Sequence, residues 1–229
     1  MLEWLSMYRW VFAISVLILL ALGVYFFLPN IRRATTRVSG FEDARVAYGA
    51  FMADHAYLDE IPDVNIVIVK NARILYLMSG DELVERWRVA LGPHPEGTKE
   101  NKRDGKTPTG DFYICSTEES SNIVALYLSY PSKTDADRGL NRKLIDSRRH
   151  DDIYSAIFNG DCPPFDTDLG GPVSIHGGGV IRDWTDGSIA VDDDVIKVLW
   201  GCAPVGTRVD IYENFDDWDL GPLMPSFIE

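Results

Sequence analysis

The segment from Val173 to Val191 holds the residue types of this sequence that are best suited to covalent chemistry. A short apolar run ends at His176, glycines follow it, and a loop then leads to Ser188. A hydroxyl or thiol becomes an effective nucleophile when a neighbouring base takes its proton, and glycine lets backbone N–H groups approach a developing oxyanion. We therefore interpret His176 as a base and residue 188 as a nucleophile. In the alternative interpretation, the glycines only form tight turns and the histidine is structural.

Short apolar runs predict the strands that must position this segment. The runs are rich in Val, Ile, Leu and aromatic residues and lie at Val64–Val69, Arg73–Met78, Val84–Leu91, Asp111–Ser116, Ile123–Ser129, Val173–His176 and Arg208–Tyr212. We expect them to follow one another as antiparallel strands. Apolar residues at helical spacing predict one or two helices that cover the sheet between Thr134 and Gly160, and a short helix from Asp192 to Trp200. The predicted fold is mainly β, with inserted helices.

Composition and residue spacing exclude several classes of function. The net charge of −13 opposes contact with nucleic acid phosphates, so we expect no nucleic-acid partner. The four histidines include no His-x-x-x-His pair and the three cysteines no Cys-x-x-Cys pair, so we assign neither a metal nor a cofactor. Three cysteines allow at most one disulfide, and we expect Cys115, in an apolar run, to be a buried inert thiol. Cys202 is a poor candidate nucleophile because a predicted helix and a turn flank it.

The first part of the chain carries a membrane signal. Residues 10–28 include no charged residue, and a helix of this length spans the ~30 Å hydrocarbon core of a bilayer. The bulky run Phe26-Phe27-Leu28-Pro29 is unlike the small-residue site of a cleaved signal peptide, so we predict an uncleaved transmembrane anchor. Residues 1–9 form a flank before it. Residues 29–62 follow as a connector and an amphipathic helix, which we expect between Phe41 and Leu58.

Four motifs, taken in order along the chain, resemble the YkuD-type L,D-transpeptidase domain. They are Gly105-Lys106-Thr107-Pro108-Thr109-Gly110-Asp111-Phe112, Ile175-His176-Gly177, Thr185-Asp186-Gly187-Ser188-Ile189 and Pro204-Val205-Gly206-Thr207. The resemblance covers residues 63–212, which we take as the catalytic domain, with a tail at residues 213–229. It implies a β-rich fold in which a catalytic cysteine attacks peptidoglycan stem peptides, releases the terminal D-alanine and passes the acyl group to an amine or to water.

The run Leu128-Ser129-Tyr130-Pro131 and the short loop after His176 are most similar to the YafK-type branch of this family. Some members of that branch cleave peptidoglycan linkages rather than forming them. The resemblance thus implies a peptidoglycan-modifying acyl-transfer enzyme that acts as a transpeptidase, or hydrolytically as an L,D-carboxypeptidase or endopeptidase. The sequence does not identify a protein partner.

The sequence departs from the family pattern at the nucleophile. Where the pattern reads Ser/Thr-x-Gly-Cys, this chain has Thr185-Asp186-Gly187-Ser188. A thiol with a pKa of ~8.5 supplies some thiolate at neutral pH, whereas a serine hydroxyl depends on a base within hydrogen-bond reach. Asp183 or Asp186 could orient His176 as the third member of a triad. Three origins of Ser188 stay open: an engineered replacement of a catalytic cysteine, a natural serine enzyme, or an inactive peptidoglycan-binding module.

The resemblance also implies roles for the residues around His176 and Ser188. The backbone N–H groups of Gly187 and residue 188 would hold the oxyanion, and Gly177 and Gly178 would let the substrate approach the backbone. A cation would bind the carboxylate of the stem peptide, since guanidinium matches a carboxylate bidentately. The candidate cations are Arg182, Lys133, Arg148 and Arg149, and we place Asp186 in the substrate site as well.

Peptidoglycan lies outside the cytoplasmic membrane, so the resemblance implies a periplasmic catalytic domain on an inner-membrane anchor. Arg32, Arg33 and Arg37 follow the predicted span and favour the opposite orientation under the positive-inside rule. We follow the resemblance, because that rule loses force for a long translocated domain. The sequence therefore predicts a single-pass inner-membrane protein with the residues after the anchor outside the cytoplasm.

Overall fold

The computed structural model describes residues 48–51, 53, 61–120 and 123–218, which belong to one compact unit. The predicted membrane span, residues 10–28, lies outside them. Within the described ranges, no helix is both long enough and apolar enough to cross a membrane. Residues 48–51 and 53 are helical, inside the predicted amphipathic helix, and the rest of that predicted helix lies outside the described residues.

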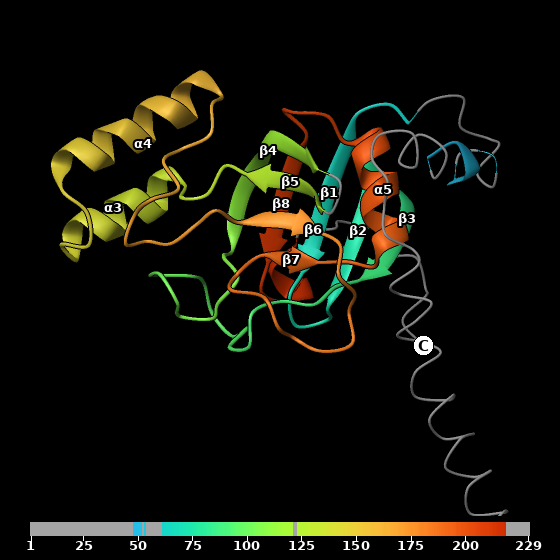
Figure 1. The fold of residues 1–229 in the computed structure, drawn as a ribbon, viewed down its shortest axis with the longest axis horizontal. Coiled ribbons are helices and arrows are strands. Elements are labelled where there is room, and N and C mark those ends of the chain that lie inside the picture. Colours follow the sequence, from blue (N-terminus) through green and yellow to red (C-terminus); the bar gives the residue numbers. More distant parts are fainter. Residues whose placement is uncertain (1–47, 52, 54–60, 121–122, 219–229) are drawn as a thin grey trace, which may run out of the picture. The chain divides into compact units, whose positions relative to one another are not determined.

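The described strands form one eight-stranded sheet with the order β3-β2-β1-β8-β4-β5-β6-β7 (Figure 1). Their bounds are β1 Val64–Val69, β2 Ile74–Ser79, β3 Glu82–Arg88, β4 Gly110–Ser120, β5 Ile123–Leu128, β6 Ser174–His176, β7 Ile189–Ala190 and β8 Arg208–Tyr212. Every predicted apolar run becomes a strand; β1 and β8 keep the predicted ends, the other ends shift by up to a few residues, and β7 is added to them. The prediction of a mainly β fold with inserted helices is therefore confirmed for the described residues.

The predicted strands that follow one another in the sequence and pair with each other are antiparallel, as expected, and two further pairs of neighbouring strands are parallel. β1 pairs in parallel with β8, and β6 with β7, while the other neighbours are antiparallel. The connections explain the difference. A parallel pair needs a connection of about a dozen residues, and the loop 177–188 returns the chain to the beginning of β7 over such a distance.

The centre of the sheet is buried on both faces. Val67 and Val69 of β1 lie in an apolar cluster with residues of β2. Ile66 and Ile68 point to the opposite face, because side chains alternate along a strand, and both are fully buried. Helix α5 (Asp193–Cys202) packs against β5 and β6. It therefore supports the strand that ends at His176.

Helices α3 (Lys133–Asn141) and α4 (Ser147–Asn159) confirm the prediction of one or two helices in this part of the chain. A capping box of Ser132 and Asp135 begins α3, and Gly160 in the left-handed region ends α4. The two helices bury their apolar sides in a cluster of their own, made by Ala136, Ile145, Ile153 and Leu169. Figure 1 shows them beside the sheet, so the expectation that they cover it was wrong.

The cysteines also correct an expectation. Cys115 forms a disulfide with Cys162 and is not an inert thiol. The pairing of β4 with β5 shifts register between Ile114 and Ser116, so Cys115 occupies a bulge. A bulge turns a residue out of the regular alternation of its strand, which an apolar run in the sequence does not reveal. The disulfide ties β4 to the segment that follows α4.

Candidate active site

Strands β6 and β7 bring His176 and residue 188 onto adjoining chain segments. In the parallel register, Ile175 lies opposite Ile189 and His176 lies opposite Ala190. Ser188 immediately precedes β7. Both His176 and Ser188 are partly exposed. A substrate can therefore reach both side chains, although the loop 177–187 separates them in the sequence.

The imidazole of His176 has a defined tautomer. Its Nδ1 lies 2.6 Å from the carbonyl oxygen of Gly177. A carbonyl oxygen only accepts hydrogen bonds, so Nδ1 carries the proton and Nε2 of the neutral ring keeps a lone pair. Trp184 packs edge to face with the imidazole, with 5.5 Å between the ring centroids. This geometry leaves Nε2 as the ring nitrogen that is able to accept a proton.

The backbone holds the hydroxyl of Ser188. The Ser174 N–H donates to Ser188 Oγ at 3.2 Å. The hydrogen bonds of the described residues include none between this hydroxyl and His176. A serine hydroxyl needs a base within hydrogen-bond reach to become a nucleophile. In this structure, the serine is therefore placed beside the candidate base without being activated by it.

Neither aspartate considered for a triad contacts the imidazole. The Gly177 carbonyl already accepts the hydrogen bond from Nδ1, where the aspartate of a triad would bind. Asp183 instead accepts hydrogen bonds from Arg73 Nη2 at 2.8 Å and from the Leu91 N–H at 2.9 Å. Asp186 is exposed, and the structure gives it no hydrogen bond or ion pair within the described residues. The arrangement of an aspartate-assisted serine triad is thus not formed.

Asp183 has a structural role, because it anchors the loop that leads to the candidate nucleophile at residue 188. The Leu91 N–H donates to its carboxylate, and the Leu91 carbonyl accepts from the N–H groups of Trp184 and Thr185 at 2.9 and 3.1 Å. The Arg73 guanidinium holds the same carboxylate from the other side. The residues shortly before residue 188 are therefore fixed against Leu91, which follows β3 in the sequence.

Thr185 fixes the turn that carries residue 188. Its Oγ1 donates to the Ser188 carbonyl oxygen at 2.6 Å and accepts from the Gly187 N–H over a long 3.4 Å. Gly187 has a φ of +111°, and a Cβ there would lie 2.6 Å from the Lys106 carbonyl oxygen. The turn thus needs glycine at 187 and a hydroxyl residue at 185. Thr185 was not among the predicted site residues, although its place in the Thr-x-Gly motif was the available signal.

Gly177 and Gly178 are packed tightly against neighbouring side chains. A Cβ at Gly177 would lie 2.6 Å from Asp193 Oδ1, and a Cβ at Gly178 would lie 2.9 Å from the ring of Trp184. The Gly178 N–H also donates to Asp193 Oδ1 at 2.8 Å, which joins the loop to the first turn of α5. Packing alone therefore explains why these two residues are glycine.

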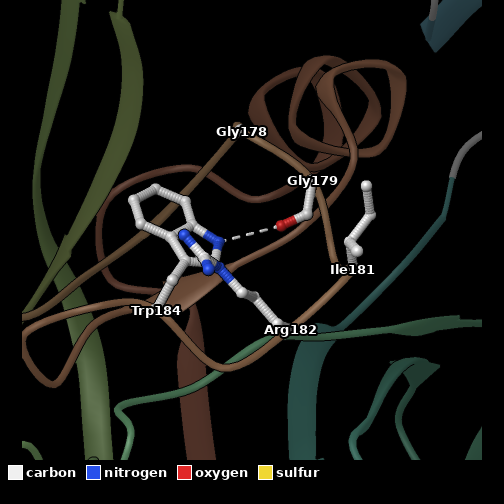
Figure 2. Close-up of a pocket in the computed structure, with 5 residues that line it drawn as sticks. All are labelled: Gly178, Gly179, Ile181, Arg182 and Trp184. Carbon is white, nitrogen blue, oxygen red and sulfur yellow. Dashed lines mark hydrogen bonds between the residues drawn. The ribbon is translucent and has the colours of Figure 1, made fainter. Parts of the chain in front are cut away.

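A pocket of about 300 Å³ opens in the same loop. Figure 2 shows the residues that line it, which are Gly178, Gly179, Ile181, Arg182 and Trp184. Trp184 Nε1 donates to the Gly179 carbonyl oxygen at 3.1 Å and so closes the loop on itself. Because Trp184 also packs against His176, it forms a physical link between the pocket and the candidate base.

Arg182 is the candidate cation that lines this pocket. Lys133 of α3 lies 5.6 Å from the centre of the Tyr154 ring. Arg149 of α4 faces Asp152 and Asp166. Helices α3 and α4 stand beside the sheet in Figure 1, and Arg148 also belongs to α4. The structure therefore brings only Arg182, of the four candidates, next to the loop that follows His176.

A buried ion pair lies behind Gly187. Lys99 is 1% exposed, and its Nζ lies 2.8 Å from Asp104 Oδ1. Burial by itself raises the pKa of Asp104, but hydrogen bonds from Lys99 and from three backbone N–H groups hold that pKa below its ordinary value. Sequence reasoning did not single out Lys99, because lysine is ordinarily a surface residue and a single one carries no signal of burial.

The thiol of Cys202 does not compete as a nucleophile. It is buried in α5, and burial raises its pKa to about 12. The thiolate is the reactive form of cysteine, so this group is inert at neutral pH. Across the described ranges, no group of three or more His, Cys, Asp or Glu side chains is arranged to hold a metal ion.

Comparison with solved structures finds similar folds at low identity. The chain is similar to Bd1075 of Bdellovibrio bacteriovorus, with 17% identity and a TM-score of 0.42 over 67% of this chain and 49% of that one. It is similar to an L,D-transpeptidase of Xylanimonas cellulosilytica, with 16% identity and a TM-score of 0.41 over 70% of this chain and 67% of that one. It is also similar to L,D-transpeptidase 1 of Mycobacterium tuberculosis, with 15% identity and a TM-score of 0.36 over 65% and 61%.

This chain therefore spans about half the length of the Bdellovibrio protein. No curated protein sequence matches it significantly. The family model of the L,D-transpeptidase catalytic domain, YkuD, matches residues 63–211, which is more than half of the 229 residues. The resemblance drawn from the ordered motifs is thus confirmed, and the chain belongs to the YkuD family of L,D-transpeptidase catalytic domains.

Proposed function

We propose that this chain is a peptidoglycan-modifying protein whose site binds stem peptides and, with a sufficiently nucleophilic residue 188, transfers their acyl group. The geometry of His176 is the observation that supports this most directly. Its Nδ1 is committed to the Gly177 carbonyl, so Nε2 is the base, and residue 188 lies on the adjoining segment. The family to which the chain belongs supports L,D-transpeptidase chemistry at this place.

The reaction begins when His176 Nε2 accepts the proton of the nucleophile at residue 188. The nucleophile attacks the carbonyl carbon between the L-centre of a diaminopimelate residue and the following D-alanine, and the carbonyl becomes an oxyanion. Backbone N–H groups around Gly187 stabilise this charge. The C–N bond then breaks, the departing D-alanine amine takes the proton from His176, and an acyl-enzyme remains. An amine or a water molecule attacks this ester or thioester and releases the product.

The pocket beside Trp184 binds the part of the stem peptide that carries a carboxylate. Arg182 supplies a guanidinium group, which matches a carboxylate through two parallel hydrogen bonds. Ile181 and the exposed part of Trp184 supply apolar surface in the same pocket. In Figure 2, the Arg182 side chain extends from the loop in the direction of Trp184. Asp186, which is exposed at the turn, remains a proposed contact for a substrate amine.

A second candidate function is a membrane-anchored module that binds stem peptides without turning them over. The contacts of Ser188 favour a binding module for the chain with serine at residue 188, because its Oγ accepts a hydrogen bond from the Ser174 N–H and has none with His176 among the described residues. A serine without an activating base is a poor nucleophile. The two candidates share the same ligand and differ in whether residue 188 forms a covalent bond.

The test compares three forms of the full-length chain in detergent: the unaltered chain, Ser188→Cys, and Ser188→Cys combined with His176→Ala. Each is incubated with disaccharide tetrapeptides, and products and protein adducts are followed by mass spectrometry. We expect Ser188→Cys to form an acyl adduct and release D-alanine, and the His176→Ala combination to lose most of this activity.

If Ser188→Cys binds muropeptides but forms no adduct and releases no D-alanine, acyl transfer is excluded and the binding module remains. Absence of muropeptide binding by every form would overturn both candidates. Turnover by the unaltered chain would instead show that Ser188 itself is a competent nucleophile. The His176→Ala combination also controls for uncatalysed attack by a surface thiol.

We also propose that residues 10–28 anchor the protein in the inner membrane and that the catalytic domain is periplasmic. The disulfide between Cys115 and Cys162 supports this location, because disulfides persist in oxidising compartments such as the periplasm. Protease treatment of spheroplasts should digest the domain without lysis. Protection of the domain until the membrane is broken would contradict the proposal.

A further inference from the structure

We propose that Lys99 is a positioning residue for the nucleophile at residue 188, which it supports from behind the Gly187 turn with a buried positive charge. The inference rests on the function proposed above, because it assigns a task to Lys99 within that reaction. Lys99 lies on the segment before β4, far from residue 188 in the sequence. It does not line the pocket and cannot contact a substrate there.

The side chain of Lys99 passes between two glycines. A Cβ at Gly170 would lie 2.7 Å from Lys99 Cε, and a Cβ at Gly187 would lie 3.3 Å from Cδ and 3.2 Å from Nζ. Both glycines have positive φ values, of +94° and +111°. The Lys99 carbonyl oxygen is held in turn by Arg138 Nη2 of α3 at 2.9 Å. Packing therefore fixes the ammonium group against the residue that precedes the nucleophile.

Among the described residues, the ammonium group of Lys99 has fewer hydrogen-bond acceptors than it has N–H donors. It has three N–H donors, and the hydrogen bonds of the described residues give it one acceptor, Asp104 Oδ1 at 2.8 Å. Asp104 cannot follow the ammonium toward Gly187, because the backbone N–H groups of Glu100, Asn101 and Lys106 also hold its carboxylate. The charged atom of the pair that lies against Gly187 is therefore the Lys99 ammonium nitrogen.

This arrangement favours the negatively charged states of the proposed reaction. A thiolate at residue 188, and the oxyanion formed beside Gly187, both gain from a positive charge that water does not screen. An opposite charge within ~4–6 Å lowers the pKa of an acid by about 1–3 units. Because the Asp104 carboxylate offsets part of this effect, we expect the lower end of the range, about one unit.

The test measures the acidity of the thiol introduced by Ser188→Cys in the full-length chain, from the rate of alkylation by iodoacetamide as a function of pH. Cys115 and Cys162 are paired and Cys202 is buried, so the introduced thiol is the one that reacts. Adding Lys99→Met should raise the thiol pKa by about one unit. Adding Asp104→Asn should lower it, since the ammonium is then no longer offset. If Lys99 and Asp104 had only a structural role, the two substitutions would not shift the thiol pKa in opposite directions.

Lys70→Met is the matched control, because Lys70 is also fully buried and its Nζ lies 2.8 Å from Glu213. It should leave the thiol pKa unchanged. Lys99→Arg should retain the low thiol pKa. If Lys99→Met leaves the pKa unchanged, or Lys70→Met raises it equally, the proposal is wrong. If Lys99→Met does not fold, the Asp104→Asn variant tests the proposal instead. An unchanged or raised thiol pKa in that variant overturns the proposal.

This readout does not use peptidoglycan, so the two proposals fail separately. Opposite pKa shifts without turnover of muropeptides would support the role of Lys99 and contradict the proposed substrate. Turnover by Ser188→Cys with no effect of Lys99→Met on the thiol pKa would support the proposed function and contradict the role of Lys99.

Discussion

Replacing Gly187 with alanine tests how the turn from Thr185 to Ser188 is built. Gly187 has a φ of +111°, where an L side chain is strained, and its Cβ would lie 2.6 Å from the Lys106 carbonyl oxygen. Backbone strain in such a region costs about 1–3 kcal/mol. Relief of the overlap requires the Lys106 backbone to move, which adds about 1–3 kcal/mol as overpacking does elsewhere. We therefore expect Gly187→Ala to lower the free energy of unfolding by about 2–6 kcal/mol.

Gly206→Ala is the matched control for this prediction. Gly206 has a φ of +95°, and apart from its chain neighbours no atom of the described residues lies within 4 Å of the place where its Cβ would be. Gly206→Ala should therefore lower the free energy of unfolding only by the cost of the backbone strain, about 1–3 kcal/mol. Urea unfolding followed by circular dichroism measures both variants. If Gly187→Ala costs no more than Gly206→Ala, the backbone of Lys106 does not crowd the turn and the reasoning fails.

The same substitution has an expected effect on chemistry. Combined with Ser188→Cys, Gly187→Ala should reduce the rate of acyl-enzyme formation by about 100-fold, because a displacement of about 1 Å at a reacting atom has an effect of that size. Gly206→Ala in the same background should leave the rate close to that of Ser188→Cys. Equal rates for the two combinations would show that the turn tolerates the displacement.

Three further predictions concern parts of the fold outside the candidate site. Replacing Cys115 and Cys162 together with alanine should destabilise the fold by about 4 kcal/mol in urea unfolding, because the disulfide closes a loop with a separation of 47 residues. Hydrogen bonds with Asp137 and Asp151 raise the pKa of His150 above 6.5, so the stability they contribute is present at low pH and is lost as the pH rises through the folded-state pKa. NMR titration should show this raised pKa, and Asp137→Asn should bring it back toward 6.5. The thiol of Cys202, with a pKa of about 12, should resist alkylation in the unaltered folded chain and react after unfolding.

Several features of this protein could be predicted from the sequence because they depend on local patterns. Strands β1 and β8 were predicted with the ends that the structure gives them, since short runs rich in Val, Ile and aromatic residues mark strands. The family could be recognised because short motifs such as Ile175-His176-Gly177 recur in a fixed order. The apolar run that ends at His176 was also visible in the sequence, and it forms β6.

Other features depend on contacts between distant segments, which local patterns do not encode. Asp183 looked like a triad member because it lies near residue 188 in the sequence, but its carboxylate is bound by Arg73. Cys115 looked inert because it lies in an apolar run, but a bulge in β4 turns it toward Cys162. Parallel pairing of β6 and β7 was missed for the same reason, because the direction of a strand depends on the path of the connection before it.

The sequence by itself determined the family, the main strands and the candidate pair formed by His176 and residue 188, because residue types and short-range spacing carry that information. The tertiary structure decided which partner each of these groups has. In the folded chain, His176 Nδ1 donates to the Gly177 carbonyl oxygen and Ser188 Oγ accepts from the Ser174 N–H. The ammonium group of Lys99 is buried against Gly187. Hydrogen bonds and burial depend on atoms that the fold brings together from distant parts of the chain, and the chemistry proposed for residue 188 depends on those atoms.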